Sequence, residues 1–210
     1  MVRRGFAVVF CLLIVLMAMP PTASAPAATG TRDVTATDSF AGGFLVASPK
    51  MTDPRFARTV ILIVSHDSSG AMGLVINRSF GTGSLKSLLK GFGIEKATVD
   101  RTVSLRYGGP VEQARGFVLH SEDYTGPSTR VVGDGVALST GFDILKALAG
   151  GTGPRLAQFL LGYAGWGPGQ LEGEIARGDW LSAPADDRLI FSEDLDRVWD
   201  EALEHAGTTL

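Results

Sequence analysis

Cysteine is almost absent from this sequence of 210 residues. The single cysteine, Cys11, lies in an apolar N-terminal run that has the features of an export signal. Removal of that signal would leave a mature protein without any cysteine. Such a protein has no disulfide bonds, no thiolate nucleophile and no cysteine-ligated zinc.

Positive charge is also scarce. The chain has 19 Lys and Arg against 22 Asp and Glu, which gives a formal net charge of -3. Loss of Arg3 and Arg4 with the signal would remove two positive charges and no negative one, and so change the net charge to -5. The sequence also has no basic helix and no helix-turn-helix spacing to supply phosphate contacts, so nucleic acid is not an expected partner.

The one long apolar run lies at the N-terminus. Arg3-Arg4 precede fifteen uncharged residues from Gly5 to Met19, and small residues follow up to Ala25. This pattern predicts a signal peptide over residues 1–25, with a competing cleavage site at Ala27. As a helix the run would reach about 22 Å, short of the roughly 30 Å hydrocarbon core. A cleaved signal is therefore favoured over a permanent membrane span.

These features predict a periplasmic protein. Residues 26–39, rich in Ala, Thr and Pro, are expected to form a flexible leader. Residues 40–210 are long enough for a single domain with a sizeable core. Two alternatives stay open. An uncleaved segment would anchor the protein in the inner membrane, its only membrane contact, and a start site near Val34 would leave the protein in the cytoplasm.

Three strands are expected early in the domain, at residues 44–48, 59–66 and 71–77. Asp67-Ser68-Ser69-Gly70 has the length and composition of a hairpin loop between the second and the third. Because these runs are apolar throughout instead of alternating, both faces of the strands should be covered.

The rest of the domain mixes helices and strands without a βαβ rhythm. Ser84 caps a predicted helix to Phe92, Thr140–Asp143 read as a capping box for a helix to Ala149, and residues 195–205 have one apolar face. Further strands are expected at residues 102–107, 116–121, 131–138 (a weak one), 156–161, 180–181 and 188–191. The predicted class is α+β, with a mixed, mainly antiparallel sheet flanked by helices.

A glycine-rich turn, G-Y-A-G-W-G-P-G-Q-L-E-G-E, runs from Gly162 to Glu174. Gly167 is the expected N-cap of a helix with Pro168 at its first position, and Gly178 is its expected C-terminal cap. A helix start of this kind can also bind an anion. Here no Lys-Ser/Thr pair follows, and the glutamates of the motif add negative charge, so tight strand-to-helix packing is favoured.

Several motifs occur together in one order. They are F-L-V-A-S-P at 44–49, D-P-R-F at 53–56, T-V-I-L-I-V-S-H at 59–66, G-A-M-G-L-V-I-N-R at 70–78, G-G-P-V at 108–111, G-F-V-L-H at 116–120 and the glycine-rich turn. With these motifs the chain resembles the YqgE/AlgH family of bacterial proteins, from Gly43 to about Leu203. The resemblance implies a bifurcated sheet curled into a pseudo-barrel with helices outside, and no established biochemical activity. Some members carry a transcriptional-regulator label. Family members usually begin just before the first motif, so the N-terminal segment is a departure.

Two histidines stand beside acidic residues. His66-Asp67 and the run from His120 to Asp123 each end a predicted strand. A small-molecule hydrolase or metal-assisted enzyme using His66 or His120 would require both rings and Asp53 to converge around a pocket. Structural roles at a hairpin and a strand edge are favoured, so no catalytic residue, metal ligand or cofactor is assigned.

The favoured hypothesis is a non-enzymatic binding or regulatory module whose partner is a protein or a small ligand. Glycine-rich loops allow a backbone to approach another surface closely, and binding residues are often found on loops. The candidate binding residues are Asp53, Arg55, His66, Asn77, Gly109, Pro110, Trp166, Gly167 and Gln170.

Overall fold

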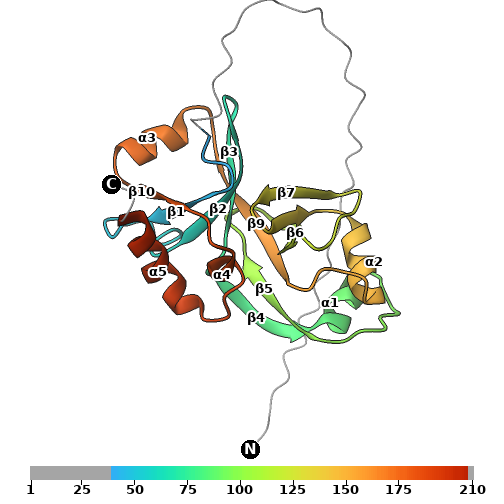
Figure 1. Ribbon diagram of the computed structural model, residues 1–210. Coiled ribbons are helices and arrows are strands. Elements are labelled where there is room, and N and C mark those ends of the chain that lie inside the picture. Colours follow the sequence, from blue (N-terminus) through green and yellow to red (C-terminus); the bar gives the residue numbers. More distant parts are fainter. Residues whose placement is uncertain (1–38, 208–210) are drawn as a thin grey trace, which may run out of the picture. The chain divides into compact units, whose positions relative to one another are not determined.

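The computed structural model describes residues 39–207, which form one ten-stranded sheet and five helices (Figure 1). The strands are β1 (Gly43–Ala47), β2 (Val60–Asp67), β3 (Gly70–Val75), β4 (Ser79–Ser84), β5 (Thr102–Tyr107), β6 (Val111–Ser121), β7 (Thr129–Gly133), β8 (Val136–Ser139), β9 (Ala157–Trp166) and β10 (Trp180–Pro184). The helices are α1 (Leu85–Gly91), α2 (Phe142–Gly150), α3 (Gln170–Ala176), α4 (Asp187–Ile190) and α5 (Leu195–Gly207).

The predicted signal peptide and nearly all of the predicted leader lie outside the described residues. Within residues 39–207, none of the helices has both the length and the apolar character that a membrane crossing needs.

Strand β9 is the point at which the sheet divides. The main path runs β10-β1-β2-β3-β9-β6-β8-β7, and β5 pairs with β9 in parallel and carries β4 on its other edge. Residues 159–161 of β9 pair with β5, whereas residues 164–166 pair with β3. Gly162 lies between these two segments with φ of +72°, a conformation that favours glycine. The predicted α+β class, with a mainly antiparallel, bifurcated and curled sheet, is confirmed, and the curled sheet forms a half-barrel.

The central strands are buried on both faces, as their uninterrupted apolar runs predict. In β2, Val60, Leu62 and Val64 belong to one core cluster, which also contains residues of α5. Ile61 and Ile63 belong to a second cluster. The alternation of side chains along a strand therefore divides one apolar run between two cores.

Several local predictions are confirmed. Asp67 pairs with Gly70 across a two-residue hairpin loop between β2 and β3. The Ser84 hydroxyl accepts a hydrogen bond from the Ser87 amide and caps α1. Gly178 follows the C-cap of α3 with φ of +75° and so ends that helix in the left-handed conformation.

Other local predictions are wrong. Residues 188–191 were expected to form a strand, but Asp186 caps the short helix α4 by accepting a hydrogen bond from the Arg188 amide. The predicted capping box at Thr140 does not form, because Gly141 is the N-cap of α2 and the Asp143 carboxylate binds Ser128 instead.

Several element boundaries also differ from expectation. Strand β6 begins at Val111 and not at residue 116, β10 continues to Pro184, and β9 continues to Trp166, so the first part of the predicted glycine-rich turn is strand. The weak strand at 131–138 is a hairpin of β7 and β8, turning at Gly135 with φ of +72°. Helix α3 begins at Gln170 behind the N-cap Gly169, so Gly167 and Pro168 precede the helix. Strand β4 was not predicted at all, because its sequence S-F-G-T-G-S has no apolar alternation.

Candidate functional site

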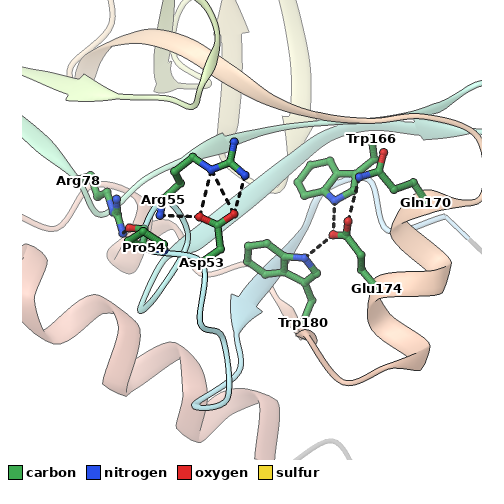
Figure 2. A network of polar contacts seen from close by, with 8 residues as sticks. All are labelled: Asp53, Pro54, Arg55, Arg78, Trp166, Gln170, Glu174 and Trp180. Atoms are coloured by element: carbon green, nitrogen blue, oxygen red, sulfur yellow. Dashed lines mark hydrogen bonds and ion pairs between the residues drawn. The ribbon is translucent and has the colours of Figure 1, made fainter.

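A groove of about 470 Å³ opens between segments that are far apart in the sequence. One side is the loop from Lys50 to Phe56, and the other is α3, which contributes Gln170 and Glu174 (Figure 2). Its volume lies in the range of small-ligand pockets, about 300–1,000 Å³. We call this site the aromatic groove; its lining residues are 50–53, 55–56, 110–111, 164–166, 170, 174 and 179–180.

The Glu174 carboxylate links the residues at the floor of the aromatic groove by hydrogen bonds. Its Oε2 accepts hydrogen bonds from the indole N–H groups of Trp166 and Trp180, both at 2.8 Å. Its Oε1 accepts one from the Gln170 side-chain amide at 2.9 Å. Gln170 Oε1 in turn accepts from the backbone N–H of Gly167 at 3.1 Å. One turn of α3 is therefore linked to β9 and to β10 through a single carboxylate (Figure 2).

Three aromatic rings form the apolar part of the floor. The rings of Trp166 and Trp180 meet edge to face with centroids 6.1 Å apart, and Phe56 meets Trp180 in the same manner at 5.6 Å. Trp166 is only 7% exposed and Trp180 2%, and both belong to a buried core cluster. Trp166 is thus a core residue that also borders the groove.

Asp53 and Arg55 form an ion pair on the opposite side. Arg55 Nη2 lies 2.6 Å from Asp53 Oδ2, and the Arg55 backbone N–H donates to Asp53 Oδ1 at 2.9 Å. The side-chain hydrogen bond from Arg55 lowers the pKa of Asp53 below its usual value. Because the Arg55 side chain is 64% exposed, this pair orders the loop locally but adds little to stability.

Asn77 and Arg78, the last two residues of the motif at 70–78, hold this loop in place by hydrogen bonds. The Asn77 side chain accepts from the Val60 amide and donates to the Arg58 carbonyl, both at 2.9 Å. Arg78 Nη2 donates to the carbonyls of Pro54 and Ala57. Asn77, a predicted binding residue, therefore positions the loop and does not line the aromatic groove.

Gly109 has a packing role next to the groove. With φ of +155°, its backbone passes so close to β9 that an added Cβ would lie 2.1 Å from the Tyr163 carbonyl carbon. This close approach sets the position of Pro110, which does line the groove.

His66 lies apart from the aromatic groove. Its Nδ1 accepts a hydrogen bond from the Phe40 amide at 3.2 Å, which places the proton of the neutral ring on Nε2, 2.8 Å from Glu172 Oε1. Glu172 has a lowered pKa, caused by a hydrogen bond from its own backbone N–H and then by the one from His66. The ring connects the start of the domain to α3.

His120 is buried in the core with both ring nitrogens engaged. Nδ1 lies 2.8 Å from the Ser121 carbonyl and Nε2 lies 2.9 Å from the Ser139 hydroxyl. Burial lowers the pKa of this imidazole. His66, His120 and Asp53 have separate hydrogen-bond partners, and nowhere in residues 39–207 do three or more His, Cys, Asp or Glu side chains gather as metal ligands.

The aromatic groove brings together part of the predicted set. Asp53, Arg55, Pro110, Trp166 and Gln170 line it, with Gly167 bonded to Gln170; His66, Asn77 and Gly109 lie outside. Sequence reasoning missed Glu174, Trp180 and Phe56. The spacing of Gln170 and Glu174, four residues apart on a helix, was a signal that they share a face.

Relatives of known sequence cover most of this chain. Residues 44–210 match the profile of the AlgH-like family. A UPF0301 protein of Methylococcus capsulatus is 58% identical over 169 residues, which are 80% of this chain and 92% of that protein. Another, from Cereibacter sphaeroides, is 46% identical over 169 residues with the same coverage of 80% and 92%.

Solved structures show the same fold. The solution structure of the AlgH protein from Pseudomonas aeruginosa aligns with a TM-score of 0.68 at 39% identity, covering 85% of this chain and 93% of that one. The crystal structure of protein DIP2367 from Corynebacterium diphtheriae aligns with a TM-score of 0.62 at 23% identity, covering 77% and 84%, and supports the fold alone. The resemblance carried by the sequence motifs is thus confirmed, and the chain belongs to the AlgH-like family.

Proposed function

We propose that this protein is a non-enzymatic binding or regulatory module and that the aromatic groove is its binding surface. One observation supports this most directly. Segments from four regions of the sequence converge on a groove that combines aromatic rings with a hydrogen-bonded carboxylate. Ligand sites are typically concave and largely apolar, with a few fixed polar groups. The ligand is a protein segment or a small molecule that enters between the loop at 50–56 and α3.

A blocking substitution tests this proposal without disturbing the core. Thr52 is exposed and lines the groove, so Thr52→Arg would fill the groove from its rim. Thr125, exposed in the loop between β6 and β7, gives the matched control Thr125→Arg. Proteins and small molecules that copurify with the full chain from its own host are compared by quantitative mass spectrometry. Thr52→Arg should lose ligands that the wild type and Thr125→Arg retain. Identical profiles for all three proteins would refute the groove as the binding surface.

The enzyme alternative receives no specific support. It requires His66, His120 and Asp53 to converge, but both nitrogens of each ring are hydrogen-bonded to different groups. Asp53 is paired with Arg55 on the groove wall. A stoichiometric transition metal in the purified protein would bring this alternative back.

We also propose that the module is exported. The support is the sequence of residues 1–25, where two arginines precede an apolar run that ends in small residues. Cell fractionation with N-terminal sequencing of the recovered protein is the test. A periplasmic protein that starts after Ala25 or Ala27 is expected. Cytoplasmic protein that retains residues 1–25, or that starts near Val34, would contradict export.

A further inference from the structure

Glu174 carries a charge that has no partner in the described part of the chain. Its three hydrogen-bond donors, Trp166, Trp180 and Gln170, are all neutral. The two other acidic residues that line the aromatic groove are neutralised: Asp53 by Arg55 at 2.6 Å, and Asp179 by Arg177 at 2.8 Å. Within residues 39–207, Glu174 forms no ion pair; Lys50, exposed on the loop side, also lines the groove but is not bonded to Glu174.

The structural role of Glu174 does not require that charge. The two indole N–H groups need an oxygen acceptor, and the amide oxygen of a glutamine at the same position would supply one, with loss only of the hydrogen bond from Gln170. Removing a carboxylate from water costs more than removing an amide, unless a cation is paired with it. A cationic ligand would supply the ion-pair partner that the Glu174 carboxylate lacks within the described residues.

The hydrogen bonds of Glu174 also limit the shape of that cation. Oε2 already accepts two bonds and Oε1 only one. A carboxylate oxygen has two lone pairs, so a single acceptor position on Oε1 is open. A guanidinium group binds carboxylates best through two parallel bonds, whereas an ammonium group is a compact point charge that needs only one.

The rest of the groove suits an aliphatic stem. Met51, Phe56 and Ala164 line it together with the two indoles, and apolar walls of this kind cover the methylene chain of a long cationic side chain. We propose that the aromatic groove binds a primary alkylammonium group, with the Glu174 carboxylate as its anchor. This inference rests on the proposed binding function of the same groove. The group is either a lysine side chain of a partner protein or a free alkyl amine.

The three tryptophans of the chain give a direct assay. In a ¹H–¹⁵N NMR spectrum, the indole N–H groups of Trp166 and Trp180 report on Glu174, whereas that of Trp199 is bonded to the Ala47 carbonyl and its ring belongs to the other core cluster. Titration with Nα-acetyl-lysine methylamide should shift the first two signals and leave the third unchanged. The Nε-acetylated form of the same compound, which is neutral, should bind at least about tenfold more weakly.

Two substitutions in α3 distinguish an effect of the Glu174 charge on binding from an effect on folding. Glu174→Gln keeps an acceptor for the indoles and should bind the lysine probe at least about tenfold more weakly. Glu172→Gln removes the same charge two residues away, where the side chain contacts His66, and should bind as the wild type does. Equal binding of the charged and acetylated probes to the wild type would overturn the proposal, even if Glu174→Gln failed to fold. Equal binding to both variants would overturn it as well.

A second probe distinguishes the source of the amine. Tighter binding of the lysine derivative than of cadaverine assigns the site to a protein partner, and the reverse assigns it to a free amine; either order supports the ammonium site. If neither probe binds while Thr52→Arg still loses copurifying ligands, the ammonium proposal fails and the binding function stands. If Thr52→Arg changes nothing and neither probe binds, both fail.

Discussion

Removal of the Glu174 side chain should destabilise the fold through the two tryptophans that depend on it. In Glu174→Ala, the indole N–H groups of Trp166 and Trp180 lose their acceptor while their rings stay 7% and 2% exposed. A buried donor without a partner costs about 1–3 kcal/mol. The two together set an upper limit near 6 kcal/mol, which water entering from the groove reduces. We expect a loss of about 2–4 kcal/mol in the free energy of unfolding.

Two comparisons make this prediction specific. Glu174→Gln retains an acceptor and should lose only about 1 kcal/mol. Glu172→Ala removes a half-exposed carboxylate on the same helix, which contacts His66, and should cost less than about 1 kcal/mol. Urea denaturation followed by circular dichroism measures all three. For a domain of this size, the loss in Glu174→Ala corresponds to a melting temperature lower by about 4–16 °C. A Glu174→Ala protein as stable as Glu172→Ala would refute the reasoning.

Two further predictions concern a glycine next to the aromatic groove and a carboxylate that lines it. Gly109→Ala would place a Cβ 2.1 Å from the Tyr163 carbonyl carbon and should cost at least about 3 kcal/mol or prevent folding. Gly169→Ala, also at positive φ but with no atom within 4 Å of the added Cβ, should cost only about 1–2 kcal/mol; equal thermal stability of the two variants would contradict the close approach. Asp53→Asn should cause a small loss of stability at neutral pH, because the pKa of Asp53 is lowered by Arg55. A carboxyl group whose pKa is lower in the folded state adds to the free energy of unfolding at every pH above its unfolded pKa, near 3.8 for Asp53. That stabilisation is lost as the pH falls through the folded pKa. Denaturation from pH 7 downward should therefore show the variant and the wild type converge in acid, and a gap that widens in acid would contradict the ion pair.

Local sequence signals were sufficient for the elements whose pattern is strong. The apolar run of β2 and the Asp67–Gly70 loop predicted a hairpin of strands buried on both faces, and the structure has one. The apolar face of residues 195–205 predicted α5. In each of these cases a short stretch determines its own conformation, because burial of its apolar side chains has one geometric solution.

Weak local patterns were decided by tertiary contacts. Strand β4 exists because its backbone pairs with β5, although its residues are exposed and include two glycines. Residues 188–191 contain the apolar run Leu-Ile-Phe and were predicted as a strand, but they lie in the helical turn α4 and its C-cap, with Leu189 and Ile190 in the core cluster shared with α5. Neither result follows from the periodicity of the segment alone.

The candidate site shows the same division. The sequence by itself determined the glycine-rich composition of residues 162–174, whose glycines permit positive φ at Gly162 and Gly169. It did not show that residues 162–166 continue strand β9, or that Asn77 and Arg78 hold the 53–58 loop. Only the tertiary structure decided that Glu174 accepts hydrogen bonds from the indole N–H groups of Trp166 in β9 and Trp180 in β10. It also placed this carboxylate in a groove that the 50–56 loop helps to line. The physical reason is that Gly108, Gly109 and Gly162 let the segment after β5 approach β9 closely, so the sheet divides there and brings distant loops to one surface.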